Sequence, residues 1–471
     1  MRDRFGPWVA LAACGLVLFA PAVLGDGDTF WQIAAGDWML AHHVVLHADP
    51  FSLTASGRPW VPHEWLSELA MAAAFAAGGW GGLLLLFGAA AGAGFWLLAR
   101  SLARWLDPTL ALAFLLLAAA SVMPGLLARP HMLAFPLLIA WTDGLLLARS
   151  RGRAPRWPLL LVLLLWANLH ASFPLGVALS AALGLEASGA AGVERWRVAW
   201  RWAAFTLAAA AVCLATPGGV EGLFLPLRML GMTALDHIEE WQGTDFSALP
   251  PAELVVLAAL YLGLGRGVRL PPVRLLVLLA LVHLAFVHRR DQLLLGVIGA
   301  MLGAEPVGRQ IGRGMPTCAV PQANWAPRAG CAAAALAALV ALRLGVPVVP
   351  RDGPTAPVAA LAHVPPGLRE EPVLNDYAFG GYLIFSGVRP YVDSRADLYG
   401  DRFLAGYAAL LGGDRDRLAA MLDRYGVAWT ILPPGSRLVP LLDAMPGWRR
   451  LYADGTAVVH ARAAQVLAAR S

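Results

Sequence analysis

Long apolar segments alternate with short polar ones from the N-terminus to about residue 345. A transmembrane helix needs about 20 mostly apolar residues, and many of these segments reach or approach that length. The pattern predicts a polytopic α-helical membrane protein. Its expected spans, about eleven, are Trp8–Leu24, Gly81–Ala99, Thr109–Met123, His131–Ala148, Trp157–Leu169, Ser172–Leu185, Trp202–Ala215, Ala252–Leu264, Pro272–Val287, Gln292–Gly303 and Ala329–Gly345.

The composition agrees with this fold class. Of the 471 residues, 58% are hydrophobic and 14% are charged, and the mean hydropathy is +0.61. Because soluble domains carry about 25% charged residues, the composition excludes a soluble enzyme, a disordered chain and a fibrous repeat.

The arginines near the span ends predict the orientation in the membrane. If Glu64–Ala77 is a helix at the outer interface rather than a further span, most arginines gather on one side, which is then cytoplasmic. The N-terminus lies on that side, and the first span stays uncleaved. The loops Gly25–Gly79 and Pro217–Pro250 and the C-terminal part lie outside. This topology explains the net charge of +5 and the pI near 9.3, so no nucleic-acid partner is needed.

The C-terminal part changes character. A transmembrane domain is expected over residues 1–348, a linker rich in Pro and Ala over 349–366, and an extracytoplasmic α/β domain over 367–471. The predicted strands are Pro372–Asn375, Arg389–Asp393 and Val427–Leu432, the predicted helices Asp401–Leu411 and Arg415–Tyr425, and the predicted hairpin Trp448–His460, turning at Asp454-Gly455.

Two carboxylates follow the first span directly, in Gly25-Asp26-Gly27-Asp28. On the predicted topology they lie outside, as do nearly all the histidines. Such a pair can hold a hard cation, for which Mg²⁺ or Mn²⁺ is the candidate, or supply a general base. The alternative is structural, with Asp28 capping the next helix, Thr29–Leu40. Asp26 is not needed for that cap.

The rest of this loop resembles a known family. Asp49-Pro50-Phe51 and then Pro62-His63-Glu64-Trp65, after an aspartate and an amphipathic helix, are similar to the first external loop of GT-C membrane glycosyltransferases. That superfamily includes oligosaccharyltransferases, protein O-mannosyltransferases and aminoarabinose transferases. The resemblance implies that Asp28 or Asp26 is catalytic, with Asp28 preferred, and that His63 and Glu64 support the site or bind the acceptor. A histidine at the interface and a glutamate favoured by a helix dipole are the structural alternatives.

A second segment, Leu374-Asn375-Asp376-Tyr377, resembles the start of the outer domain of oligosaccharyltransferases. The resemblance implies that Asp376 and Tyr377 contact the acceptor. The tryptophans of that family are absent here, which argues against recognition of an asparagine sequon. Alternatively, Asp376 caps a helix.

A third segment, His288-Arg289-Arg290-Asp291, places two arginines at the outer end of a span, against the positive-inside rule. Arg289 and Arg290 therefore need an anionic partner, and a lipid phosphate suits the arginine fork. A salt bridge to Asp291 or a contact with lipid headgroups is the alternative.

Four further residues complete the predicted acceptor-binding or supporting set: His131, His170, Glu239 and Glu240. The Arg129-Pro130-His131 loop lacks the second acidic pair that oligosaccharyltransferases carry there. A satisfied interfacial histidine and an exposed charged turn are the alternatives.

These observations predict an inverting GT-C-like glycosyltransferase of the bacterial inner membrane. The resemblance implies that it moves a sugar from a polyprenyl-phosphate or -pyrophosphate donor to a glycan, lipid or protein acceptor of the cell envelope, on the outer face. Two alternatives remain open: a transporter or flippase of a lipid-linked or anionic solute, and a non-catalytic scaffold with a degenerate GT-C fold.

Overall fold

The computed structural model describes residues 6–229, 231–233, 239–311, 326–349 and 351–468. The chain divides into two compact units. The helical unit comprises Met1–Ala20, Gly81–Arg228 and Asp236–Val346, and the sheet unit comprises Pro21–Trp80, Met229–Leu235 and Pro347–Ser471. The predicted boundary after residue 348 lies close to the boundary at Val346. The first external loop, however, falls in the sheet unit rather than with the transmembrane part.

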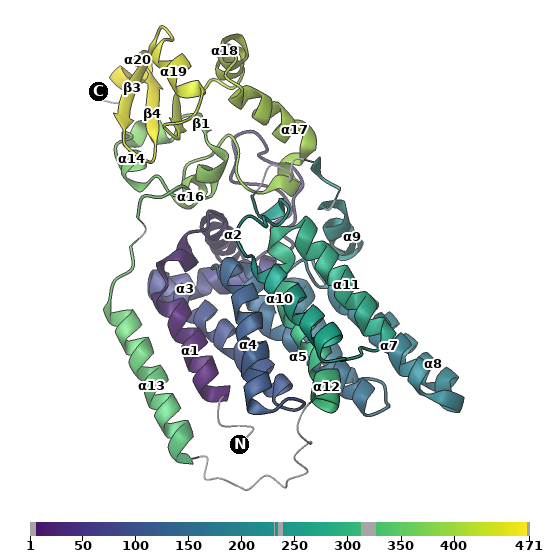
Figure 1. The fold of residues 1–471 in the computed structure, drawn as a ribbon. Helices are drawn as coiled ribbons and strands as arrows, with labels where there is room; N and C mark the ends of the chain where they lie inside the picture. Colours follow the sequence, from purple (N-terminus) through teal and green to yellow (C-terminus); the bar gives the residue numbers. More distant parts are fainter. Residues whose placement is uncertain (1–5, 230, 234–238, 312–325, 350, 469–471) are drawn as a thin grey trace. The chain divides into compact units, whose positions relative to one another are not determined.

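The apolar segments form the α-helices of the helical unit (Figure 1). Proline begins several of them, at the first-turn position where its missing N–H costs nothing. The helices are α1 (Gly6–Phe19), the second part of α3 (Trp65–Leu102), α4 (Pro108–Val122), α5 (Pro130–Ser150), α6 (Leu160–Leu169), α7 (Pro174–Ala190), α8 (Arg195–Val212), α9 (Gly219–Met229), α10 (Pro251–Leu260), α11 (Pro272–Val287), α12 (Gln292–Gln310) and α13 (Ala326–Gly345).

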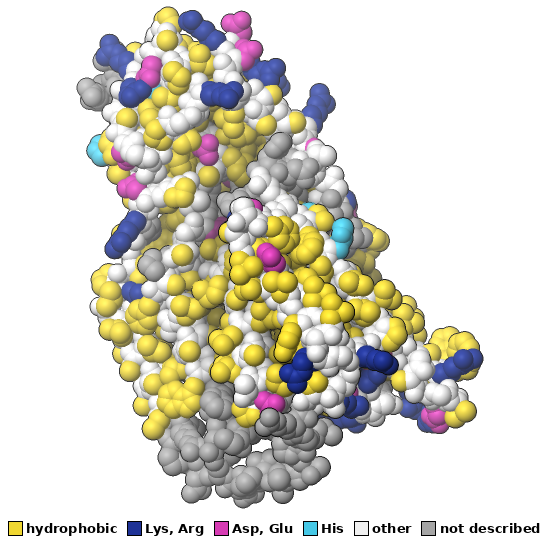
Figure 2. Space-filling view, in the orientation of Figure 1, with side chains coloured by type: hydrophobic (Ala, Val, Ile, Leu, Met, Phe, Trp, Pro, Cys, Tyr) yellow, Lys and Arg dark blue, Asp and Glu magenta, His cyan; other side chains and the backbone are white. Residues whose placement is uncertain are grey.

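Three of these helices, in the part of the chain that the structure describes, are long and apolar enough to cross a membrane: Trp65–Leu102, Pro108–Gly125 and Pro130–Ser150. Six shorter apolar helices have 10–17 residues each. Large apolar side chains such as Leu116, Leu161 and Leu276 are exposed on the helices, and apolar side chains cover much of the visible flank of this unit (Figure 2). Such a surface fits contact with lipid. The number of transmembrane spans, about eleven, stays a prediction.

Helix α3 is interrupted directly after Ala77, the predicted end of an outer helix. Gly78 (φ −154°) and Gly79 (φ 57°, ψ −145°) leave helical geometry. The segment before this break, which begins at Trp65, belongs to the sheet unit, and the helix from Gly81 onward belongs to the helical unit. Whether the first segment lies at the outer interface stays a prediction.

The sheet unit is built on four strands in the order β1-β2-β4-β3. β1 (Val373–Asn375) and β2 (Trp429–Leu432) are parallel, and β4 (Val458–Arg462) is antiparallel to β2 and to β3 (Trp448–Ala453). Its helices are α2 (Asp28–His42), the first part of α3, α14 (Val358–Ala362), α15 (Pro366–Arg369), α16 (Gly380–Phe385), α17 (Ala396–Leu411), α18 (Arg415–Arg424), α19 (Leu438–Asp443) and α20 (Ala463–Ala468).

Most of the predicted elements of this unit are confirmed. Asp454 shapes the predicted hairpin turn, since its carboxylate accepts from the amides of Thr456 and Ala457. The predicted linker is partly folded: α14 lies in it, and Ala360, Leu361 and Val364 join the core.

The predicted strand Arg389–Asp393 is wrong. No ladder forms there, because the Asn375 side chain takes the backbone groups that a neighbouring strand would use. Its Oδ1 accepts from the Tyr391 amide at 2.7 Å, and its Nδ2 donates to the Val392 carbonyl at 2.8 Å.

Candidate active site

Asp26 and Asp28 lie at the start of α2, and their roles are the reverse of those expected for a helix cap. The helix begins at Asp28, whose amide donates to Asp26 Oδ1 at 2.7 Å. The Asp28 carboxylate instead accepts hydrogen bonds from the Ser394 hydroxyl and, at 3.3 Å, from the Trp31 indole N–H. Asp26 therefore supports the helix start, while the Asp28 carboxylate bonds to the side chains of Ser394 and Trp31.

Ser394 comes from the segment before α17. The Trp31 indole N–H also donates to the Ser394 hydroxyl oxygen at 3.0 Å, so hydrogen bonds join Asp28, Trp31 and Ser394 in pairs. The Tyr377 hydroxyl donates to the Ser394 carbonyl at 3.2 Å. This contact connects a predicted acceptor residue to the backbone beside Asp28.

Buried Arg395, the residue after Ser394, connects the first external loop to the C-terminal segment. It donates to Asp393 with Nε at 2.8 Å and Nη2 at 2.7 Å, and to Asp49 with Nη1 at 2.7 Å. Its guanidinium also lies over the ring of Trp60, at 4.8 Å from the centroid. Desolvation by burial would raise the pKa of Asp49, but Arg395 and hydrogen bonds from Ser52 and Phe51 outweigh it and lower that pKa.

Sequence reasoning missed Ser394, Arg395 and Asp49 as parts of this site. Asp49 and Arg395 are 346 positions apart, and Asp28 and Ser394 are 366 apart. The only signal was the charge-rich run Asp393-Ser394-Arg395 beside Asp-Pro-Phe in the first loop.

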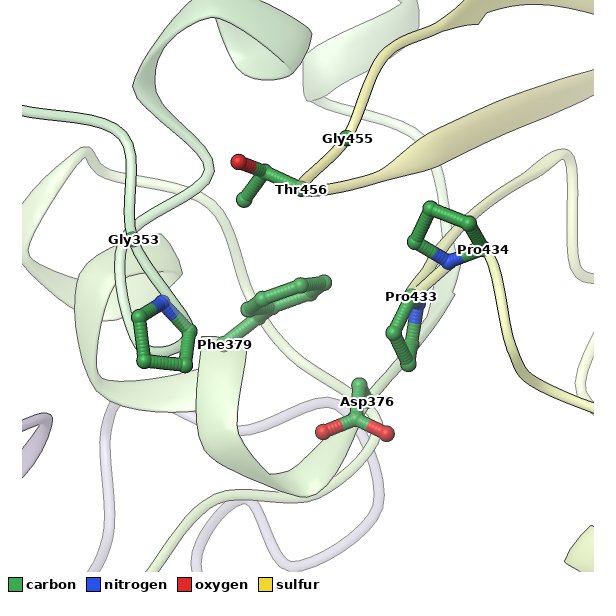
Figure 3. Close-up of a pocket in the computed structure, with 8 residues that line it drawn as sticks. Gly353, Asp376, Phe379, Pro433, Pro434, Gly455 and Thr456 are labelled. Atoms are coloured by element: carbon green, nitrogen blue, oxygen red, sulfur yellow. The ribbon is translucent and has the colours of Figure 1, made fainter.

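Asp376 acts as a helix cap, which was the structural alternative to acceptor binding. It caps the short helix Tyr377–Phe379 by accepting from the Ala378 amide at 3.0 Å. It also lines a pocket of about 360 Å³ with Phe379, Pro433, Pro434 and Thr456 (Figure 3). Desolvation by burial raises the pKa of this carboxyl above its ordinary value.

His63 and Glu64 lie just before α3, close to α2. The His63 Nε2 is 3.8 Å from Glu64 Oε1, and Gln32 of α2 donates to Glu64 Oε2 at 3.3 Å. One turn further along α3, the buried Glu68 carboxylate has no hydrogen-bond partner among the described residues. Here α2 and α3 are in close contact, because Gly36 faces the Glu68 backbone.

A second group of predicted residues meets at one end of the helical unit. Glu240 accepts from Arg129 through Oε2, and its Oε1 lies 3.5 Å from Arg290 Nη1. The Arg290 guanidinium lies over the Trp241 ring at 4.5 Å from the centroid. The anionic partner that the sequence required for Arg290 is thus a protein carboxylate, Glu240. The Arg289 amide donates to the Gln242 carbonyl at 2.9 Å.

The two predicted histidines near this end make local contacts. His131 Nε2 donates to the Gly125 carbonyl at 2.6 Å, and His170 Nδ1 accepts from the Ser172 hydroxyl at 2.7 Å. Their ring centroids are 6.1 Å apart. Both fit the interpretation of a satisfied histidine at a span end. The Glu239 side chain lies outside the described part of the chain.

The prediction of a bound cation rests on the carboxylates of Asp26 and Asp28. In the described residues, no three side chains of His, Cys, Asp or Glu come together as metal ligands. An ion held by Asp26 and Asp28 would have to take its remaining ligands from substrate oxygens and water, as Mg²⁺ often does. The cation stays a prediction.

Solved structures share this fold over nearly the whole chain. ArnT from Cupriavidus metallidurans bound to undecaprenyl phosphate matches with a TM-score of 0.53 at 14% identity, covering 97% of this chain and 98% of that one. The same protein in the apo state gives a TM-score of 0.55 at 14% identity, covering 98% of each chain. No protein-family model and no curated protein matches the sequence. The likeness shows that this chain has the ArnT fold.

Proposed function

We propose that this chain is a membrane glycosyltransferase that moves a sugar from a polyprenyl-phosphate or -pyrophosphate donor to an acceptor of the bacterial cell envelope. The main support is the shared fold over 97% of the chain with an ArnT structure that holds undecaprenyl phosphate. The donor's chain stays in lipid while its head reaches water, which suits a protein with an apolar helical unit and polar groups at the span ends.

Asp28 is the proposed catalytic base. Its carboxylate would take the proton of an acceptor hydroxyl while that oxygen attacks the anomeric carbon of the sugar. The new glycosidic bond forms as the bond from carbon to the phosphate oxygen breaks, and the electron pair leaves with the polyprenyl phosphate. Hydrogen bonds from Ser394 and Trp31 orient the carboxylate for this step.

Arg289 and Arg290 are the proposed donor-phosphate ligands, together with Arg129, which shares Glu240 with Arg290. Guanidinium groups bind phosphate oxygens in pairs, and a leaving phosphate gains negative charge in the transition state. His63, Glu64, Asp376 and Tyr377 are proposed to support or bind the acceptor, and an outward-facing C-terminal domain belongs to the same proposal.

The proposal is tested by envelope glycan analysis in a strain that lacks the gene and is complemented with variants of the full-length protein. We expect Asp28→Asn to lower the glycan by at least about hundredfold, the usual contribution of a positioned base. Asp37→Asn, on the exposed side of the same helix, should restore the glycan fully. Full restoration by Asp28→Asn would leave the transporter and scaffold alternatives and reject the catalytic assignment.

A further inference from the structure

The arginines proposed to bind the donor phosphate already hold an anion. Glu240 spans Arg129, before α5, and Arg290, between α11 and α12, with one carboxylate oxygen toward each. A phosphate would present its oxygens to the same two guanidinium groups in the same way. The carboxylate and a phosphate ligand therefore compete for one place.

Glu240 remains an anion under ordinary conditions. Desolvation by partial burial would raise its pKa, but Arg129 and Arg290 outweigh this and hold the pKa below the ordinary value for glutamate. Protonation of Glu240 near neutral pH is thus not a route to freeing the arginines. The carboxylate has to be displaced by another anion.

Arg290 has support that does not depend on Glu240. Its guanidinium lies over the Trp241 ring, and Trp241 is fixed by its carbonyl, which accepts from His288 Nδ1 at 2.9 Å. A cation over an aromatic face is stabilised by about 0.5–2 kcal/mol. Arg290 can therefore keep its place when Glu240 moves away.

Displacement of Glu240 changes the charge around the two guanidinium groups. With Glu240 in place, its carboxylate offsets part of the positive charge of Arg129 and Arg290. Once the carboxylate is displaced, both guanidinium groups can face the incoming phosphate.

We infer that Glu240 is an internal competitor for the phosphate, and that the affinity for the polyprenyl-phosphate group is set by exchange of this carboxylate for the ligand. This inference rests on the proposed function and adds to it a residue that weakens binding. A weakened site has a use in turnover, because the product phosphate carries more negative charge than the donor and would otherwise be released slowly.

Binding of undecaprenyl phosphate to the full-length protein in detergent tests this inference. Glu240→Gln keeps the size and polarity of the side chain and removes its charge. We expect Glu240→Gln to bind undecaprenyl phosphate about tenfold more tightly than the unchanged protein, because a like charge no longer opposes the ligand. Glu240→Ala should give a similar gain and serves where Glu240→Gln does not fold. Glu194→Gln removes an exposed glutamate paired with Arg197 at 3.5 Å and should leave binding unchanged.

The outcomes separate the inference from the proposed function. We expect Arg290→Gln and Arg129→Gln to weaken binding at least about tenfold. If they do so while Glu240→Gln and Glu240→Ala bind equally or more weakly than the unchanged protein, Glu240 positions the arginines instead of competing, and the inference is overturned alone. If both arginine variants bind normally, the proposed phosphate site fails together with the inference.

Discussion

The Asp28 carboxylate shows how one residue depends on a distant part of the chain. One of its oxygens accepts from Trp31 on its own helix and from Ser394, 366 positions away. A hydrogen bond to a charged group contributes about 1.5–3 kcal/mol, enough to fix which lone pair faces a substrate. The sequence indicates Asp26 and Asp28 as candidates from their place after the first span, but it does not indicate Ser394, since a lone serine carries no periodic or compositional signal.

Ser394→Ala should therefore lower the rate of glycan formation about tenfold or more while the protein stays folded. Ser394→Thr keeps the hydroxyl and should recover most of the rate. The measurement is the initial rate of glycan appearance after induction of each variant, with protein amounts matched. Ser436→Ala, in a turn of the same unit, is the control. Equal rates for alanine and threonine at position 394 would contradict an orienting role.

Asp49 gives a prediction on pH at the same scale. Its folded pKa lies below the unfolded value of about 3.9, so the ionised group stabilises the fold above that pH. This stability is lost as the pH falls through the folded pKa. We expect the melting temperature to fall more steeply below about pH 4 in the unchanged protein than in Asp49→Asn, which is less stable at neutral pH. Parallel curves would argue against this ion pair.

At the scale of elements, local sequence patterns predicted the helices and the hairpin, but they did not predict contacts between distant segments. Apolar runs located the helices, and Asp454-Gly455 located the hairpin. The segment Arg389–Asp393 has the residues of a strand, yet its partner is the side chain of Asn375, which no local pattern reveals. The contact of α2 with α3 was equally hidden, because it depends on a missing side chain at Gly36.

Gly36→Ala tests that contact. A Cβ at this position would lie 2.1 Å from the Glu68 carbonyl oxygen and 2.7 Å from the Ala72 Cβ. Backbone cannot give way as a side chain can, so α2 must shift, at a cost of about 1–3 kcal/mol. Thermal unfolding in detergent should show a lower midpoint for Gly36→Ala. Gly435→Ala, which meets nothing within 4 Å, should unfold like the unchanged protein.

For the whole molecule, the charge pattern of the sequence predicted a topology that the helical unit is consistent with. Loops assigned to one side of the membrane meet at one end of this unit, as Arg129, Glu240 and Arg290 do. The orientation itself is tested by labelling single cysteines in a background without the four native ones. Ser56→Cys should react with an impermeant reagent in intact cells, and Arg153→Cys only after lysis. The reverse result would reject the predicted orientation.

The opposite end of the helical unit contains an ion network that charge counting did not reveal. Arg274, 1% exposed, donates to Glu186 at 3.0 Å and to Glu305 at 2.8 Å, so it joins α11 to α7 and α12. Arg149 of α5 also pairs with Glu186. In the sequence pattern, such arginines indicate the cytoplasmic face. Arg274, however, is buried and connects three helices through its ion pairs.

Arg274→Met should destabilise the helical unit strongly, because it leaves two buried carboxylates with less compensation. Removing one partner of a buried ion pair typically lowers the free energy of unfolding by about 3–5 kcal/mol. Packing of the methionine side chain offsets only part of this loss. The expected result is a clearly lower midpoint of thermal unfolding and less monodisperse protein after extraction. Arg266→Met, an exposed residue between α10 and α11, controls for loss of one positive charge. An Arg274→Met protein as stable as the Arg266→Met protein would show that Arg149 and Arg309 neutralise the glutamates without Arg274.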